Sequence, residues 1–274
     1  MNDLTIVGTI TIDRLHFRNE IRESFGGTPW FAIELSQDEK LKIRIVTNVG
    51  RDFPFKKLPK HILKASKINV TGENTTTLDI FPDRKGVPAK VKDFTGEIKN
   101  ISSLRGNVII ISPLFQEISI NSLKKLRAKF TTIIIDIQGF TRLSFMQNMK
   151  LSDDIKTEPK VLPQLCRIAD IIKFSENELD VVLPKLTLNK KLLTLHSWGL
   201  KSVVITQSDK GCIISTNNSL PKILPVKTIK TSDAVGAGDK FLILLGIFLA
   251  KNNRFENSVI MAQDRLLKIM EAKI

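Results

Sequence analysis

The sequence is poor in the side chains that build disulfide frameworks and most transition-metal sites. It contains two cysteines and three histidines in 274 residues, and neither set is clustered. Cys166 and Cys212 lie in apolar surroundings without metal-ligand spacing, so we interpret both as small buried hydrophobes. We therefore expect neither a disulfide scaffold nor a histidine-based metal centre.

Long apolar runs and targeting signals are also missing. The longest apolar stretch, residues 241–250, is about half as long as a bilayer-spanning helix and is expected to form a buried helix. The N-terminus enters a strand-like segment at once, without the pattern of a secretory signal. We expect no membrane association, and the few cysteines favour the reducing cytoplasm.

Acidic residues are the minority among the charged side chains. There are 42 lysines and arginines against 28 aspartates and glutamates, which gives a formal net charge of +14. This balance favours anionic partners, either nucleic acid or the phosphates of a small molecule, unless it reflects no more than a lysine-rich composition. The basic residues are scattered and form no block or aromatic-interleaved stripe, so no specific nucleic-acid partner is expected.

Short runs rich in Ile and Val recur along the chain and predict strands buried on both faces of a sheet. They are residues 4–10, 43–49, 108–111, 132–137, 171–174 and 203–206. Helix-like segments lie between them at residues 30–40, 117–129, 159–167, 176–183 and 189–198. This alternation indicates an α/β fold, with a doubly wound, mostly parallel sheet flanked by helices.

Two stretches break this rhythm and alternate polar with apolar residues. They run from about 11 to 25 and from about 71 to 98, and each is typical of antiparallel strands with one solvated face. We expect them to form a small antiparallel β lid that closes over a site and excludes water. Since no repeat or long linker is present, residues 1–274 are predicted to form a single domain with this lid inserted.

The strongest chemical signal is a glycine-rich turn before a long apolar segment, residues 231–241, TSDAVGAGDKF. Gly236 and Gly238 allow a tight turn, and a helix that begins near Ala237 would direct free N–H groups at an anion such as a transferring phosphate. Asp239 lies in the first turn of that helix, where its carboxylate can accept the proton of an attacking hydroxyl. A plain glycine turn with an aspartate at a helix start is the alternative interpretation.

This segment resembles the C-terminal signature of the ribokinase (PfkB) family of carbohydrate and nucleoside kinases, Asp-Thr-Thr-Gly-Ala-Gly-Asp-x-Phe. The match includes Asp233, Gly236, Ala237, Gly238, Asp239 and Phe241, and it fails at Ala234 and Val235. Further similarities follow in order along nearly the whole chain. The resemblance implies a ribokinase-like fold and a Mg²⁺-dependent kinase that moves the γ-phosphoryl group of ATP to a small polyol. Asp239 would be its base, and residues 236–238 its anion-binding turn.

The resemblance also implies where the acceptor binds. Asp13 ends a strand similar to the one whose terminal aspartate binds substrate hydroxyls in the family. The pair Gly26-Gly27 resembles the glycines that let the substrate approach the backbone. Phe31 stands where the family usually has an asparagine, so one polar substrate contact is lost.

A second acceptor segment follows a buried strand at residues 136–142, DIQGFTR. Open α/β sheets place ligands at the carboxyl ends of their strands. The run resembles one in inositol-kinase-like branches of the family, and it implies substrate-binding roles for Asp136 and Arg142. A strand-end turn with a solvated arginine explains these residues equally well.

The donor end of the site is implied by two more motifs. Residues 206–211, TQSDKG, resemble the family's Thr-x-Gly-x-x-Gly nucleotide turn, in which Thr206, Ser208 and Gly211 hold the motif positions and Ser208 replaces a glycine. Glu178 matches the last residue of Asn-x-x-Glu, which holds magnesium largely through water, although Ser175 replaces the asparagine. An ordinary exposed helix glutamate is the alternative for Glu178. Asp233 is a candidate ligand for a monovalent cation such as K⁺.

The altered motif positions keep a second hypothesis open, in which a catalytically weak relative binds a nucleotide or metabolite as a sensor. The acceptor can be a sugar, a sugar acid, a nucleoside or a cyclitol, and the donor ATP, ADP or GTP, because a fold does not choose among them. We expect a small-molecule polyol and a nucleotide as partners. A homodimer formed through the lid is a further hypothesis.

Overall fold

The computed structural model describes residues 3–36, 42–81, 89–141, 150–151, 161–217, 219–227 and 236–272. Its main sheet has nine strands in the order β14-β13-β12-β11-β9-β8-β1-β4-β5. The strands are β1 (Leu4–Gly8), β4 (Ile43–Val49), β5 (Lys67–Val70), β8 (Gly106–Ser112), β9 (Phe130–Asp136), β11 (Ile171–Ser175), β12 (Ser202–Thr206), β13 (Cys212–Thr216) and β14 (Lys222–Leu224). Neighbouring strands are parallel from β5 to β12, and β13 and β14 add an antiparallel edge. The predicted mostly parallel sheet is confirmed.

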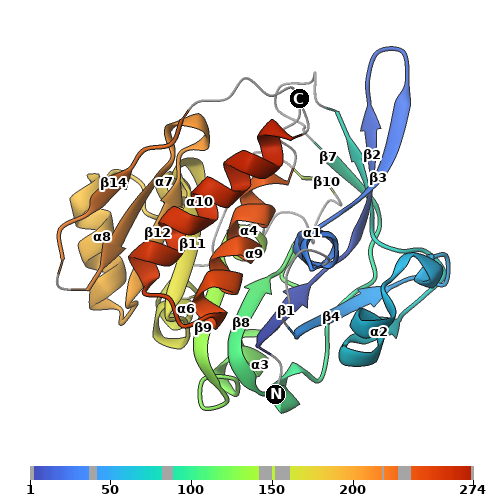
Figure 1. Cartoon of the computed structure of the whole chain (residues 1–274), viewed down its shortest axis with the longest axis horizontal. Coiled ribbons are helices and arrows are strands. Elements are labelled where there is room, and N and C mark those ends of the chain that lie inside the picture. Colours follow the sequence, from blue (N-terminus) through green and yellow to red (C-terminus); the bar gives the residue numbers. More distant parts are fainter. Residues whose placement is uncertain are drawn as a thin grey trace.

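Helices cover both faces of this sheet (Figure 1). One layer consists of α1 (Thr28–Leu35), α2 (Lys60–Ala65), α9 (Ala237–Ala250) and α10 (Phe255–Glu271). The other consists of α3 (Ile120–Lys124), α4 (Gln138–Thr141), α6 (Val161–Ile168), α7 (Glu176–Val182) and α8 (Leu188–Ser197). Short 3₁₀ turns lie at Phe55–Lys57, Ile101–Ser103 and Ser208–Lys210.

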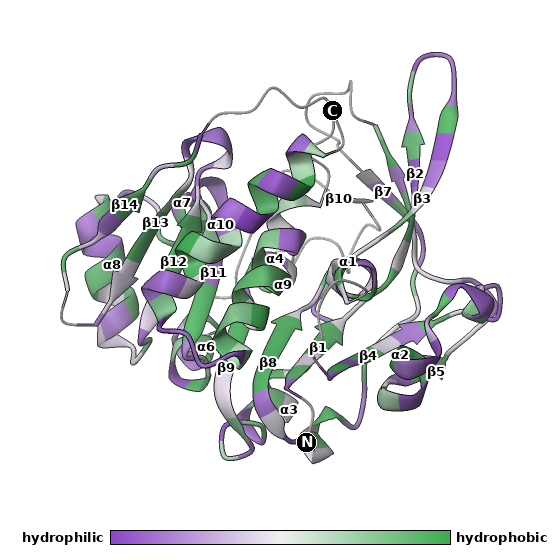
Figure 2. Cartoon of the chain, viewed as in Figure 1, coloured by the Kyte–Doolittle hydropathy of each residue, from purple (hydrophilic) through white to green (hydrophobic). Residues whose placement is uncertain are grey.

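The two layers enclose two separate apolar cores, one on each face of the sheet. Successive side chains of a strand point to opposite faces, so Ile6 enters the core under α9 while Val7 enters the other. A sheet covered on both faces needs apolar side chains on both, and the central strands are accordingly mostly hydrophobic (Figure 2). The apolar run at 241–250 forms most of α9, which is buried against β1 and β8. No described helix is long and apolar enough to cross a membrane.

A second, five-stranded sheet forms the lid, in the order β10-β7-β6-β2-β3. Its strands are β2 (Thr11–His16), β3 (Ile21–Gly26), β6 (Thr77–Ile80), β7 (Ala89–Asp93) and β10 (Lys150–Leu151). The β2–β3 hairpin projects from the body of the molecule (Figure 1). All of these strands except β10 lie in the two stretches predicted to form the lid.

The expectation of a wholly antiparallel lid is wrong for one pair of strands. β2 and β6 run parallel, with Ile12 paired to Thr77 and Leu15 paired to Ile80. Each of them follows a strand of the parallel main sheet, β1 or β5. Both segments therefore leave the same edge of that sheet in the same direction, and the lid becomes a mixed sheet.

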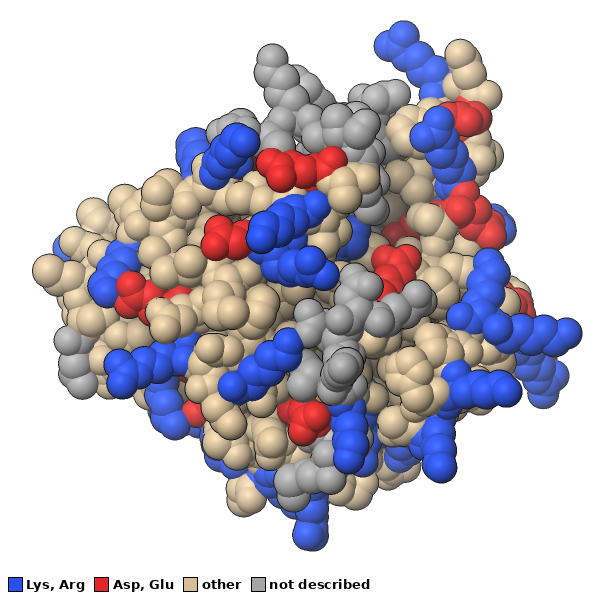
Figure 3. All heavy atoms as spheres, in the orientation of Figure 1, with Lys and Arg blue, Asp and Glu red and all other residues tan. Residues whose placement is uncertain are grey.

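Basic side chains are spread over the surface. On the face shown in Figure 3, lysine and arginine side chains lie over all parts of the described surface, with acidic side chains between them. Arg14 and Glu23 on the lid, and Lys222 and Glu256 on the body, form ion pairs of this kind. The positive charge is therefore partly neutralised locally and forms no continuous basic stripe on this face of the described chain.

Candidate active site

The carboxyl ends of five parallel strands meet at one edge of the main sheet. Strands β1, β8, β9, β11 and β12 end at Gly8, Ser112, Asp136, Ser175 and Thr206. Open α/β sheets bind ligands outside this edge. The start of α9 lies there too, because Asp239 contacts Thr28 and Thr28 contacts Ser112. Most of the predicted site residues are thus brought together.

The turn before α9 requires glycine for two separate reasons. Gly236 is left-handed, with φ of 72°, and a Cβ added to it would lie 2.4 Å from two carbons of the Phe31 ring. The N-cap residue of α9 is Gly236, which has no side chain to cap the helix that begins at Ala237. The N–H groups and the positive end of the dipole at this helix start suit an anion. Phe31, at the position of the family's asparagine, packs against this turn.

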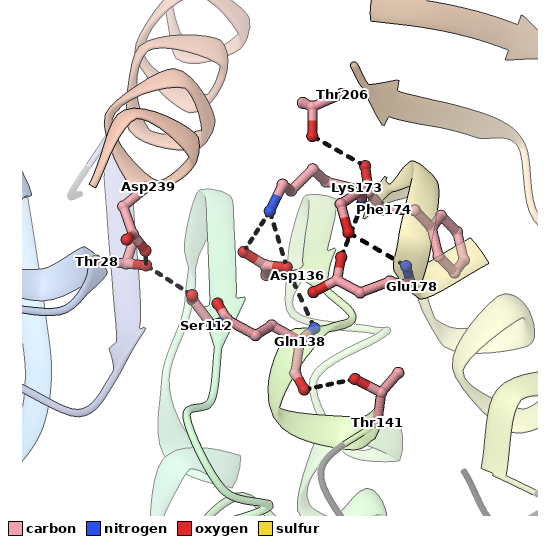
Figure 4. A network of polar contacts seen from close by, with 11 residues as sticks. Thr28, Ser112, Asp136, Gln138, Thr141, Lys173, Phe174, Glu178, Thr206 and Asp239 are labelled. Carbon is pink, nitrogen blue, oxygen red and sulfur yellow. Dashed lines mark hydrogen bonds and ion pairs between the residues drawn. The ribbon is translucent and has the colours of Figure 1, made fainter. Parts of the chain in front are cut away.

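One hydroxyl group contacts the carboxylate of Asp239, and a second hydroxyl group contacts the first (Figure 4). Thr28 Oγ1 donates a hydrogen bond to Asp239 Oδ1, and it lies 2.6 Å from Ser112 Oγ. Thr28 and Ser112 are both buried, at the start of α1 and the end of β8. Sequence reasoning assigned no role to either residue. The usable signals were that Ser112 ends a buried strand and that Thr28 follows the Gly26-Gly27 pair.

Asp13 supplies a second carboxylate, from lid strand β2. It is buried, and within the described chain its Oδ1 atom has no hydrogen-bond partner. Burial raises the pKa of Asp13 to about 6, a hydrogen bond from Thr11 opposes the shift, and the negative charge of Asp239 adds to it. Buried acceptors are nearly always satisfied in folded proteins, so an unpartnered carboxylate oxygen here is suited to a ligand hydroxyl.

The glycine pair makes room for this carboxylate. A Cβ at Gly26 would lie 2.0 Å from Asp13 Oδ2, and one at Gly27 would lie 2.1 Å from the Thr9 carbonyl oxygen. Gly27 also has a positive φ of 85°. The pair therefore lets the chain pass close to Asp13 between β3 and α1. Its role in the approach of a substrate stays a prediction.

A buried ion pair occupies the centre of the edge (Figure 4). Lys173 Nζ lies 3.2 Å and 3.3 Å from the two carboxylate oxygens of Asp136 on the neighbouring strand. Burial alone would lower the pKa of Lys173, but the negative charges of Asp136, Glu178 and Asp239 outweigh it and raise that pKa. Lys173 is thus a cation. Sequence reasoning gave it no role, although a lysine within the apolar run 171–174 was a readable signal.

The Asp136 carboxylate was expected to receive a substrate hydroxyl, and the structure places it in this ion pair. Its substrate-binding role stays a prediction. The other residue expected from that segment, Arg142, lies outside the described residues, and so does Asp233.

Glu178 lies at the same edge and caps a helix. Ser175 N–H donates to Glu178 Oε2 at 2.7 Å, and Glu178 N–H donates to Ser175 Oγ at 3.2 Å, which is a capping box at the start of α7. Ser175, which replaces the family's asparagine, therefore has a structural task. Among the described residues no three His, Cys, Asp or Glu side chains are grouped to hold a metal. One partly engaged carboxylate fits a water-mediated Mg²⁺ site completed by substrate phosphates, and does not fit an all-protein cage.

A cavity of about 450 Å³ adjoins the start of α9. The three residues predicted to bind nucleotide, Thr206, Ser208 and Gly211, all line it. Ser208 has a φ of 53°, so the serine adopts the left-handed conformation that a glycine would take most easily. The other lining residues are Asp209, Cys212, Val226, Lys227, Ala237, Gly238, Phe241, Gln263, Leu266, Leu267 and Met270. The cavity is of the size that holds small ligands and is lined largely by apolar side chains.

Comparisons with known proteins identify relatives in sequence and in fold. The model of the pfkB family carbohydrate kinases matches residues 127–264, half of the chain. The chain is 26% identical to a cytidine kinase of Thermococcus kodakarensis over an alignment of 285 residues. This alignment covers 99% of this chain and 97% of the relative.

Solved structures show the same fold. A pyrophosphate-dependent kinase in the ribokinase family, complexed with a pyrophosphate analog and myo-inositol, has a TM-score of 0.81 at 17% identity, covering 98% of this chain and 95% of that one. A fructokinase from Vibrio cholerae, bound to fructose, ADP and calcium ion, has a TM-score of 0.74 at 17% identity, covering 96% and 89%. The segment matched by the family model includes Lys173, the Thr206–Gly211 turn and the start of α9. With that match and the shared fold, the chain belongs to the pfkB family of carbohydrate kinases.

Proposed function

We propose that the protein transfers the terminal phosphoryl group of a nucleoside triphosphate, most simply ATP, to a hydroxyl of a small polyol, with Asp239 as the base. The observation that carries the proposal is the position of Asp239. It follows Ala237 and Gly238, which line the cavity, and its charge acts on the buried Asp13 of lid strand β2. One carboxylate thus lies between the cavity, to which we assign the donor compartment, and Asp13, to which we assign the acceptor compartment.

The acceptor is oriented by the lid side of the site. Asp13 Oδ1 accepts a hydrogen bond from one hydroxyl of the polyol, and the Gly26-Gly27 backbone lets the ring approach. Asp239 accepts the proton of the reacting hydroxyl, with its orientation fixed by Thr28. A base of ordinary acidity suffices, because the transition state of phosphoryl transfer is loose and positioning supplies most of the acceleration.

The transfer step is a substitution at phosphorus. The acceptor oxygen forms a bond to the terminal phosphorus while the bond from that phosphorus to the bridging oxygen breaks. The nucleoside diphosphate leaves with the bonding electron pair, and the acceptor's proton goes to Asp239. The free N–H groups at the start of α9 stabilise the charge that develops on the moving group.

Glu178 is the residue that would hold Mg²⁺ through water, and the ion, when bound, would neutralise charge on the donor phosphates. The capping box fixes the direction of the Glu178 carboxylate toward the strand edge. A monovalent cation at Asp233 remains part of the proposal.

The cavity supports a nucleotide donor. Its lining includes the apolar side chains of Val226, Phe241, Leu266 and Met270, and Gln263 supplies a polar group among them. A planar base fits between such side chains and can hydrogen-bond to an amide, whereas inorganic pyrophosphate would leave this apolar surface unused. This favours a nucleotide over pyrophosphate, the donor named for one structural neighbour.

The acceptor is proposed as a class. One relative, matched over 99% of this chain, is a cytidine kinase, and structural neighbours were solved with myo-inositol or fructose. Phe31 removes the polar contact that an asparagine would make and packs against Gly236. Nucleosides and cyclitols are therefore the first acceptors to test.

The proposal is tested by a phosphorylation panel. The purified protein is supplied with Mg²⁺ and with ATP, GTP, ADP or pyrophosphate, and each donor is offered nucleosides, cyclitols, sugars and sugar acids. We expect a phosphorylated product for one acceptor class with a nucleoside triphosphate. Nucleotide binding without turnover on every acceptor would instead support the sensor hypothesis.

A further inference from the structure

The buried ammonium of Lys173 lies beside Gly238, in the first turn of α9. Its side chain is 8% exposed and lies on β11, with Asp136 Oδ1 and Oδ2 at 3.3 Å and 3.2 Å. An ammonium group has three N–H donors. In the described chain Asp136 is the hydrogen-bond partner of Lys173, and its carboxylate can accept from two of these donors. A third donor can therefore serve a ligand.

The position of Gly238 shows where the ammonium lies relative to the donor. Gly238 lines the cavity, and a Cβ placed on it would lie 3.6 Å from Lys173 Nζ. Asp239 is the next residue in the chain. A polyphosphate that runs from the cavity toward Asp239 would pass Gly238, and Lys173 lies beside Gly238. Figure 4 shows Lys173 and Asp239 at the same edge of the sheet.

The local charge requires a cation at this point. Asp136, Glu178 and Asp239 place three carboxyl groups around Lys173, close enough for each to act on its charge. A donor with several negative charges would be repelled from this edge unless cations offset the carboxylates. The start of α9 contributes the partial charges of its dipole and one lysine, Lys240, whose ammonium lies over the Phe31 ring at 4.5 Å from its centroid. The described residues at the site offer no cluster for a metal cage.

We propose that Lys173 is a further catalytic residue, whose ammonium binds a non-bridging oxygen of the donor's terminal phosphate and stabilises the charge on that group during transfer. Asp136 is its positioning residue. A buried carboxylate on the adjacent strand holds the flexible lysine stem in one direction and keeps the ammonium charged before the donor arrives. This inference rests on the proposed function, and it goes beyond it by naming a side-chain contact to the transferred group.

The first test replaces the ammonium and leaves the apolar stem, as Lys173→Met. We expect kcat to fall by about 10²- to 10³-fold, the loss typical of one preorganised donor at a developing charge. Calorimetry with inorganic tripolyphosphate should show an affinity at least about tenfold weaker, while the affinity for adenosine stays unchanged. Wild-type kcat in this variant, or equal losses for tripolyphosphate and adenosine, would overturn the proposal.

Lys191→Met is the matched control. Lys191 is also a buried lysine paired with an aspartate, Asp180, but it lies on α8 and lines neither compartment. We expect this variant to keep wild-type kcat and tripolyphosphate affinity. If Lys191→Met lowers both as much as Lys173→Met does, then loss of any buried lysine has the same effect and the proposal fails.

A double variant separates catalysis from folding. Removing one partner of a buried ion pair leaves an uncompensated charge, whereas removing both relieves it. Asp136→Asn with Lys173→Met should therefore recover the melting temperature lost in either single variant, but should not recover kcat or tripolyphosphate affinity. Recovery of kcat would show that the pair is only structural.

The tripolyphosphate measurement also distinguishes the two proposals. If the wild-type protein phosphorylates no acceptor, the proposed function fails. Loss of tripolyphosphate binding in Lys173→Met would then still place the ammonium on the phosphate, and unchanged binding would refute this inference as well.

Discussion

At the residue scale, the hydroxyl of Thr28 donates a hydrogen bond to the proposed base, and a single substitution removes it. Thr28→Val keeps the shape of the side chain and deletes its hydrogen bond to Asp239. A hydrogen bond to a charged group contributes about 1.5–3 kcal/mol, so kcat should fall by about 10- to 100-fold. Steady-state kinetics checks this, with the acceptor KM as a second reading.

Thr28→Ser is the control for this change, because it keeps the hydroxyl and removes only a methyl group. We expect it to retain most of the wild-type kcat. If valine and serine at this position give the same kcat, the hydroxyl does not orient Asp239.

Acceptor binding should depend on the ionisation of Asp13. Its pKa is raised to about 6, so the carboxylate takes up a proton as pH falls through that value. The protonated acid loses part of its capacity to accept hydrogen bonds from a hydroxyl. We therefore expect the acceptor KM to rise below about pH 6, while donor affinity measured by calorimetry changes little. A flat acceptor KM from pH 5 to 8 would contradict this role.

The same shift makes Asp13 a destabilising group at neutral pH. Its folded pKa of about 6 lies above the ordinary value of 3.8, so the folded state binds the proton more tightly than the unfolded state does. The cost of burying the charge is present above pH 6 and disappears as pH falls from 6 toward 4. At pH 8, Asp13→Asn should raise the free energy of unfolding by up to about 3 kcal/mol and should therefore unfold at a higher temperature than the wild type. This difference in stability should shrink toward pH 4. Thermal melts at both pH values test the sign.

The sequence predicted residues whose chemistry is local and missed those that act through distant partners. Asp239 and Gly236 could be located because they lie within one helix start. Thr28 could not, because its partner Asp239 is 211 positions away. The ion pair of Lys173 with Asp136 likewise depends on the register between β9 and β11. That register cannot be predicted from the sequence of either strand alone.

At the scale of elements, the start of α9 must keep both its left-handed turn and its space. Gly236→Ala would strain a φ of 72° and press a methyl group into the Phe31 ring. Backbone strain alone costs about 1–2 kcal/mol, and the collision adds to it. We expect Gly236→Ala to weaken tripolyphosphate binding and to lower kcat under conditions where the variant is still fully folded.

Gly96→Ala is the control that measures the cost of a positive φ without a steric collision. Gly96 also has a positive φ, of 78°, but a Cβ there would meet no atom within 4 Å. This variant should lose about 1–2 kcal/mol of stability, measured by denaturant unfolding, and keep full activity. Equal losses of activity in the two variants would refute a specific role of the α9 turn.

Elements in the interior of the fold were easier to predict than those at its edges. The β-branched runs of β1, β9 and β12 are buried on both faces and therefore nearly uniform in composition. β14 has only three residues, two of them exposed, and β5 has one exposed and three half-buried residues, so neither shows that pattern. The segment expected to be helical at 117–129 holds only α3, Ile120–Lys124. The parallel β2–β6 pair could not be predicted. Alternation of polar and apolar residues shows which face of a strand is buried, but it does not show whether neighbouring strands run parallel or antiparallel.

At the scale of the whole molecule, the lid is the part whose assembly is still a prediction. Its hairpin projects from the body, and Ile21 at its outer part is 62% exposed, with Phe17 nearby and 37% exposed. If two copies pair through their lids, Ile21→Glu should convert a dimer into a monomer, because a charge would be buried in the interface. Analytical ultracentrifugation of the wild type and the variant checks this. A monomeric wild type would refute the dimer hypothesis directly.

The central claim is that Asp239 is the base of a phosphoryl transfer, and one variant tests it most directly. Asp239→Asn keeps the size of the side chain and removes its basicity, while Asp264→Asn, at an exposed position of α10, is the control. With the acceptor identified by the panel, kcat of Asp239→Asn should fall by about 10²- to 10⁴-fold while nucleotide affinity measured by calorimetry stays within about twofold of wild type. Phosphorylation by Asp239→Asn at the wild-type rate would contradict the account.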